Sequence, residues 1–118
     1  MNLKDIAATL SLENLTPGLD LKDDAPVTRA HSSDLLSDVL AHAPAGGILL
    51  TIQVHMNVVA VAVHAGLRAV IFASGMKPAD DVRARAVEEG IALFSTPETT
   101  FDAGGKLYAL GLRGEGKG

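Results

Sequence analysis

The second half of the chain alternates three short apolar runs with segments that carry helix signals, and this alternation constrains the fold more than any other feature. The runs cover residues 48–52, 69–73 and 91–94, and they are apolar or small on both faces. Strands of this kind are typical of a sheet that is covered on both sides. Strands that alternate with helices predict parallel pairing with right-handed crossovers. We therefore predict an α/β fold with a parallel-sheet core and helices on both faces.

Capping residues, prolines and glycines mark where the helices between these runs should begin and end. The stretch 58–63 is rich in valine, which favours a strand by propensity, but a strand through 48–65 would be far longer than usual. We therefore expect a helix there. The first expected helix is 58–65, between the cap Asn57 and the stop Gly66. The second is 78–89, from Pro78 to the stop Gly90. The third starts at the capping box of Ser95 and Glu98 and ends near Leu110.

The first half of the chain is less regular. Its first segment, 3–10, follows Asn2 and carries an i, i+3, i+4, i+7 apolar stripe, so we expect a capped helix there. Short strands are expected over 11–15 and 27–30. Beyond them, Ser33 and Asp34 can cap a further helix over 35–43. The expected buried face of that helix consists of Leu35, Leu36, Val39 and Leu40.

Length and composition indicate one domain. The chain has 118 residues, which is the commonest size for a single domain. We assign 1–112 to one α/β domain and expect the Gly- and charge-rich residues 113–118 to form a disordered tail. A hydrophobic content of 47% excludes a disordered chain. Aromatic residues make up only 3%, so the core must consist of valine, isoleucine, leucine and alanine.

The charge of the chain argues against a nucleic-acid partner. Ten basic and fourteen acidic residues give a net charge of −4, and the basic residues form no cluster. The few aromatic residues also argue against the stacking surfaces that bind single strands. The chain has no cysteine, which excludes disulfides, thiolate metal sites and cysteine nucleophiles and fits a reducing cytosol. We therefore expect a cytoplasmic protein without a nucleic-acid partner.

We expect no membrane segment. The apolar stretch 48–65 is interrupted by Gln53, His55, Asn57 and His64, and polar groups are costly at bilayer depth. The first twelve residues lack the apolar core of a signal peptide.

Polar loops follow each of the three predicted buried strands. Ligands of open parallel sheets bind beyond the carboxyl ends of the strands, so these loops should share one rim. Each loop leads into a helix N-terminus, where amide groups and the helix dipole favour an anion. The alternative is that several of these residues only cap their own helices. The candidate ligand contacts in these loops are Gln53, His55, Asn57, Ser74, Gly75, Ser95 and Thr96.

No signature of catalysis or of cofactor binding is present. The sequence has no GxxxxGK[ST] loop, no GxGxxG after a strand and no GxSxG elbow. The four histidines are scattered without the spacing of a helical zinc site, and Asp38 with His42 is explained as an ordinary helical pair. Serines lie near His31 and Asp34, but adjacency in sequence does not make a triad. We expect a non-enzymatic protein without a metal or a cofactor.

Three segments resemble the DRTGG domain family. They are 27–41, with the run Ser33-Asp34-Leu35-Leu36-Ser37-Asp38; 52–62, with the loop Gln53-Val54-His55-Met56-Asn57; and 89–97. The likeness covers nearly the whole chain, and it adds Ser33 and Asp34 to the candidate ligand contacts. The paired glycines of the family's name are replaced by residues around Arg29 and Ala30, which puts in doubt any close backbone contact with a ligand there.

The resemblance implies a fold similar to the N-terminal domain of HPr kinase/phosphorylase and a regulatory role. Family members accompany CBS domains in some pyrophosphatases, precede some phosphotransacetylases, and occur alone near iron-hydrogenase components. Our first hypothesis is a dimeric regulatory module that binds a small anionic ligand, such as a nucleotide or a phosphate compound. The second is an assembly protein for a larger enzyme system, for example a hydrogenase, with an apolar patch on 35–43 as its contact with a protein partner. The third is a small phosphotransferase, for which the phosphate loop is lacking.

Overall fold

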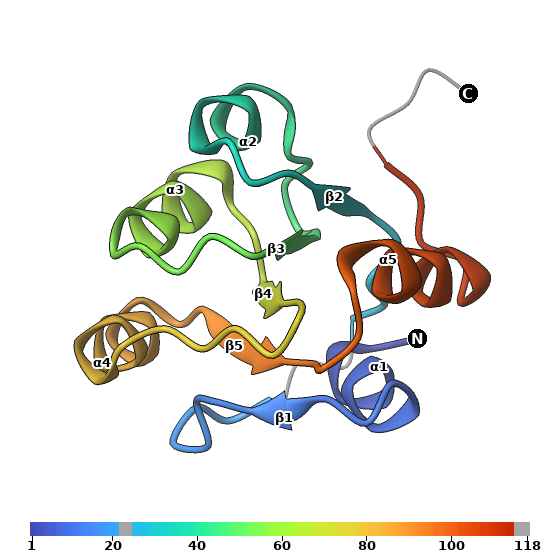
Figure 1. The fold of residues 1–118 in the computed structure, drawn as a ribbon, viewed down its shortest axis with the longest axis horizontal. Helices are drawn as coiled ribbons and strands as arrows, with labels where there is room; N and C mark the ends of the chain where they lie inside the picture. The colour runs from blue at the N-terminus through green and yellow to red at the C-terminus, as the bar shows by residue number, and fades with distance from the viewer. Residues whose placement is uncertain (22–24, 115–118) are drawn as a thin grey trace.

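Five strands form one mixed sheet in the computed structural model, which describes residues 1–21 and 25–114 (Figure 1). The strand order is β1-β5-β4-β3-β2. The strands β2 to β5 are parallel, and β1 pairs with β5 in the antiparallel direction. The strands are β1 Glu13–Asn14, β2 Ala30–Ser32, β3 Ile48–Thr51, β4 Ala69–Phe72 and β5 Ala92–Ser95.

Helices cover both faces of this sheet (Figure 1). They are α1 Leu3–Thr9, α2 Leu36–His42, α3 Asn57–Ala65, α4 Asp80–Glu89 and α5 Thr100–Ala109. The helices α2, α3 and α4 pack on one face, where Leu49, Val70 and Leu93 are paired in register across the three central strands. The helices α1 and α5 pack on the other face. The predicted α/β fold, with a parallel core and helices on both faces, is confirmed.

The valine-rich segment after β3 is helical, as its caps and length predicted. It ends at Gly66, whose φ of 72° lies in the left-handed region that favours glycine. Gly90 ends α4 in the same way. No helix in the described part of the chain is long and apolar enough to cross a membrane. The apolar stretch 48–65 divides instead into β3 and α3.

The starts of α2, α3, α4 and α5 differ from the predicted ones, and α2 begins one residue later than expected, at Leu36. Asn57 is the first residue of α3 rather than its cap, and its amide N–H donates to His55 Nδ1 at 3.1 Å. Ser95 stays in β5, where its hydroxyl donates to the carbonyl of Met76. The cap of α5 is Thr99, which accepts the amide of Asp102 at 3.2 Å. The predicted Ser95–Glu98 capping box is therefore wrong, and Pro78 lies two residues before α4 rather than in its first turn.

The predicted buried face of α2 is only partly correct. Val39 is fully buried, whereas Leu35 and Leu40 are 65% and 48% exposed. The helix contains only seven residues and lies at the β2 edge of the sheet (Figure 1), where it packs mainly against α3. Leu36 and Val39 make this contact, whereas Leu35 precedes the helix and Leu40 faces outward.

The C-terminal segment extends the β2 edge. Arg113 forms a parallel bridge with Arg29, and its carbonyl accepts the amide of Ala30 at 3.0 Å. The Arg113 guanidinium also lies 3.5 Å from the ring centroid of Tyr108. Arg113, which we placed in the predicted tail, is therefore held in the fold, and residues 115–118 of that tail lie outside the described residues. The strand expected over 27–30 is displaced, because β2 begins at Ala30.

Candidate functional site

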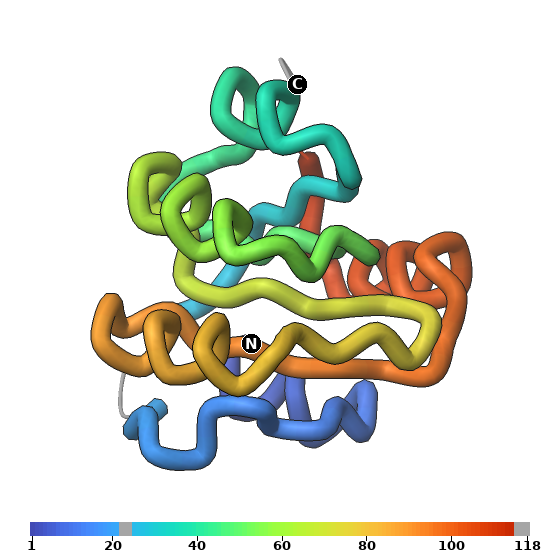
Figure 2. The backbone as a smooth tube through the Cα atoms, turned by 60° about the vertical axis from the view of Figure 1, so that its left-hand side comes forward, coloured from blue at the N-terminus to red at the C-terminus, as the bar shows by residue number. Residues whose placement is uncertain are grey.

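The carboxyl ends of the parallel strands β2, β3, β4 and β5 meet at one edge of the sheet, and the loops that follow them lie along that edge. We call this surface the strand-end rim and define it as residues 33–35, 52–57, 74–77 and 96–98. Figure 2 shows the turn after β4 and the connection after β5 at the same end of the molecule. The rim gathers all the ligand contacts proposed from the sequence, except Ser95, which is the last residue of β5.

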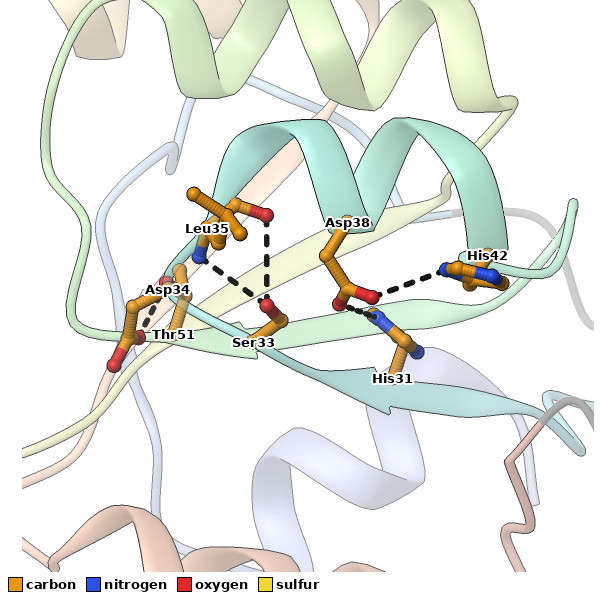
Figure 3. Close-up of polar contacts among 7 residues, drawn as sticks. All are labelled: His31, Ser33, Asp34, Leu35, Asp38, His42 and Thr51. Carbon is orange, nitrogen blue, oxygen red and sulfur yellow. Dashed lines mark hydrogen bonds and ion pairs between the residues drawn. The ribbon is translucent and has the colours of Figure 1, made fainter.

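Asp34 ties the β2 end of the rim to the end of β3 (Figure 3). Its Oδ1 accepts the Thr51 hydroxyl and the Ile52 amide, each at 2.9 Å. Thr51 is fully buried, so its hydroxyl has to be paired inside the fold. The predicted helix cap at Asp34 is therefore wrong. Ser33 is the residue that turns the chain into α2, because its hydroxyl accepts the Leu35 amide at 3.2 Å.

Asp38 holds two histidines beside this corner (Figure 3). His31 Nε2 from β2 lies 2.8 Å from Asp38 Oδ2, and His42 Nδ1 from the last turn of α2 lies 3.0 Å from Oδ1. The pKa of Asp38 is held below its ordinary value of 3.8, mainly by the hydrogen bond from His31 and next by one from Ser33. The three side chains link α2 to the edge strand β2. The Asp38–His42 pair is predicted by its i, i+4 spacing in the sequence, whereas only the fold brings His31 close.

The Asp38 cluster should make the protein more sensitive to acid. A carboxyl whose pKa is lowered by folding adds stability above its unfolded pKa, and this stability is lost as the pH falls through the folded value. We therefore expect Asp38→Asn to lose less stability than the wild type when the pH falls below 3.8. Urea unfolding of both proteins at neutral pH and near pH 3 measures this difference. Equal losses in the two proteins would contradict it.

The loop between β3 and α3 is held by its own side chains. Gln53 N–H donates to the Thr51 hydroxyl at 3.0 Å, and His55 N–H donates to Gln53 Oε1 at 3.2 Å. Asn57 N–H in turn donates to the His55 ring. One acceptor atom of Gln53 and one of His55 therefore shape the loop, while the Gln53 NH2 group and His55 Nε2 are not used in these bonds.

The turn after β4 is locked to the loop after β5. Ser74 and Gly75 have φ values of 57° and 71°, and the Met76 amide donates back to the Ala73 carbonyl at 3.1 Å. Left-handed conformation is uncommon for serine. The two turn amides point at the neighbouring loop: Ser74 N–H donates to the Glu98 carbonyl at 2.7 Å, and Gly75 N–H to the Thr96 carbonyl at 2.8 Å.

These bonds change what the rim offers to a ligand. The amides of Ser74, Gly75 and Asn57, which we expected to favour an anion, already donate within the protein. Acidic side chains add to this effect: Asp80 and Asp81 occupy the first turn of α4. A bare phosphate therefore gains little from the backbone of these loops.

The rim also exposes apolar side chains, which the sequence analysis did not select. Their exposed fractions are 65% for Leu35, 40% for Ile52, 37% for Met56 and 39% for Met76. They come from three successive loops of the rim. Methionine is flexible and polarizable, and it suits surfaces that adapt to apolar or aromatic partners. The rim is thus an apolar surface among hydrogen-bonding groups rather than a cradle for an anion.

The serines and histidines of the β2 corner do not form a nucleophilic triad in these positions. Ser33 Oγ contacts the Leu35 backbone, and His31 Nε2 is directed at Asp38. Among the described residues, no group of three or more His, Asp or Glu side chains is placed to hold a metal ion.

Hollows also lie away from the rim. One of about 390 Å³ lies near the amino ends of β4 and β5 and is lined in part by Arg68, Gly90 and Ile91. Another of about 220 Å³ lies between α3 and α4. Neither hollow is lined by a site residue predicted from the sequence.

Comparisons with known proteins identify the fold. No protein-family model matches the chain, and no curated protein matches it either. A solved structure of the CBS and DRTGG domains of the regulatory region of Clostridium perfringens pyrophosphatase, complexed with the activator diadenosine tetraphosphate, is similar with a TM-score of 0.74 and 17% identity. The match covers 90% of this chain and 45% of that one, so the chain spans less than half the length of that regulatory-region chain. The chain therefore shares an α/β fold with part of that regulatory region.

Proposed function

We propose that the chain is a non-catalytic regulatory module that senses a nucleoside-type ligand at the strand-end rim. This proposal rests on the exposed Ile52 and Met56, which flank Gln53 and His55 in the loop after β3, and on the exposed Met76 in the next loop of the rim. A planar base can pack on the apolar side chains, while the amide and imidazole groups recognise its edge. The similar pyrophosphatase region is regulatory and was crystallised with an adenine nucleotide, which makes such compounds the first probes.

The apolar rim distinguishes this ligand from a simple anion. The loop amides are already bonded inside the protein, and carboxylates lie nearby. Phosphate groups should therefore add little, and most of the affinity should come from the base. Adenosine, ATP and diadenosine tetraphosphate should all bind, whereas inorganic phosphate should not.

A thermal-shift titration tests this proposal. A ligand at one hundred times its dissociation constant adds about 2.7 kcal/mol, which raises the Tm of a domain of this size by about 10 °C. We expect this shift with the adenine compounds and none with phosphate. Ile52→Glu and Met76→Glu should abolish it, while Val87→Glu, at a similarly exposed position on α4, should retain it. Shifts that survive both rim changes would show that the ligand binds elsewhere.

An assembly protein is the second candidate. It is favoured by the exposure of Leu40 on α2 and of Leu35, which directly precedes that helix. In that case no small ligand changes the Tm, and Leu40→Glu should prevent binding to a protein partner. If no ligand in the screen changes the Tm of the wild-type protein, the assembly hypothesis is favoured over ligand sensing.

A further inference from the structure

Two side-chain groups in the loop after β3 take no part in the internal hydrogen bonds of that loop, and both groups are donors. Gln53 Oε1 accepts the His55 amide at 3.2 Å, so the NH2 group is the part of Gln53 that a ligand can use. His55 Nδ1 accepts the Asn57 amide at 3.1 Å. A neutral imidazole that accepts at one nitrogen carries its proton on the other, so His55 presents Nε2–H. Both groups therefore require acceptor atoms on a ligand.

The loop fixes these two groups as donors. Each side chain accepts an amide N–H from the residue two positions farther along the chain. The Gln53 amide N–H is itself bound to the hydroxyl of the buried Thr51 at 3.0 Å. Turning the Gln53 carboxamide over would place its NH2 group against the His55 N–H, so that two donors would face each other. The loop therefore offers a preorganised pair of donors.

Asp34 adds an acceptor on the other side of Gln53. Its Oδ1 accepts the Ile52 amide at 2.9 Å, one residue before Gln53, and also the Thr51 hydroxyl (Figure 3). Its Oδ2 takes no part in these two bonds, and the side chain is exposed. His55 comes two residues after Gln53 and is also exposed. Along this part of the rim the order is therefore acceptor, donor, donor.

We infer that the rim selects a 6-oxopurine, which is guanine or hypoxanthine, over adenine; this inference rests on the proposed function. The edge of a 6-oxopurine presents the N1–H donor followed by the acceptors O6 and N7, which complements the order of Asp34, Gln53 and His55. Adenine presents its N6 amino donor between the acceptors N1 and N7, so that amino group would face the Gln53 NH2 group. Adenine compounds still bind, because every purine can pack on Ile52 and Met56.

Calorimetric titration of the wild type with four nucleoside monophosphates tests this selectivity. The bases are guanine, hypoxanthine, adenine and 7-deazaguanine, and the phosphate is the same in all four. We expect the guanine and hypoxanthine compounds to bind about 10-fold more tightly than the adenine compound, which is the discrimination of one good pair of hydrogen bonds. The 7-deazaguanine compound, which has a C–H group in place of N7, should lose most of this advantage.

The titrations separate this inference from the proposed function. Equal dissociation constants for all four compounds, or tighter binding of the adenine compound, would overturn the selectivity and leave a nucleoside-sensing rim in place. If none of the four compounds binds, both the selectivity and the proposed function are wrong.

Gln53→Glu tests the residue that makes the choice. A carboxylate oxygen can still accept the His55 amide, but the second oxygen replaces the NH2 donor by an acceptor. The adenine amino group then finds a partner and O6 does not, so we expect the preference to reverse in favour of adenine. The ratio of the two dissociation constants within each variant is compared, so that the added charge cancels. Val87→Glu adds the same charge on α4 and should keep the wild-type ratio. An unchanged ratio in Gln53→Glu would overturn the inference.

Discussion

Phe72→Ala should lower the free energy of unfolding by about 3–5 kcal/mol, because it removes a large buried ring from the centre of the sheet. Phe72 is fully buried at the end of β4 and packs in the cluster beneath α2, α3 and α4. The other buried ring, Phe94, packs on the opposite face of the sheet and cannot fill the cavity. Urea unfolding monitored by circular dichroism measures the loss.

Phe101→Ala is the matched control for this change. The same atoms are removed, but Phe101 is 87% exposed in the first turn of α5. Its effect should remain within about 0.5 kcal/mol, which is usual for surface positions. Equal losses at the two positions would contradict the core described above.

Thr51→Val should cost about 1.5 kcal/mol and loosen the centre of the rim. Valine keeps the shape of threonine but removes the hydroxyl that donates to Asp34 and accepts the Gln53 amide. A hydrogen bond to a charged group is worth about 1.5–3 kcal/mol, and the exposure of Asp34 favours the lower end. The free energy of unfolding gives the cost, and faster amide exchange at Gln53 would report the loosened loop.

Asp34→Asn provides the control for the Thr51 change. An asparagine Oδ1 can still accept from the Thr51 hydroxyl and the Ile52 amide, so this variant should lose less stability than Thr51→Val. The two changes share one hydrogen bond, and their combined cost should therefore be smaller than the sum of the single costs. Additive costs would show that Asp34 and Thr51 act independently.

The sequence predicted the fold well where the chain alternates strand and helix. Short runs that are apolar on both faces have few alternatives to a buried parallel strand, and glycines fixed the ends of α3 and α4. Helix starts were less predictable because polar side chains have several partners within reach. Ser95 bonds to Met76 and Asp34 bonds to Thr51, although each also precedes a helix in a capping pattern.

The sequence predicted where the candidate site lies but not which chemical groups it exposes. Strand order alone brings the polar loops to one edge. Whether their amides are available depends on contacts between loops, such as the bond from Ser74 N–H to the Glu98 carbonyl, and no spacing in the sequence reports these. The outward direction of Met56 and Met76 likewise follows from the packing of α3 and of the β4–α4 turn.

Amide NMR spectra of the labelled protein, titrated with diadenosine tetraphosphate, test the proposed function most directly. We predict saturable shifts concentrated on the strand-end rim, at Ile52, His55 and Ser74, with little change at the opposite edge near Arg68 and Ile91. The Ile52→Glu variant should show none of these shifts. Saturable shifts at the opposite edge, or an unchanged spectrum at millimolar ligand, would contradict a nucleoside-sensing rim.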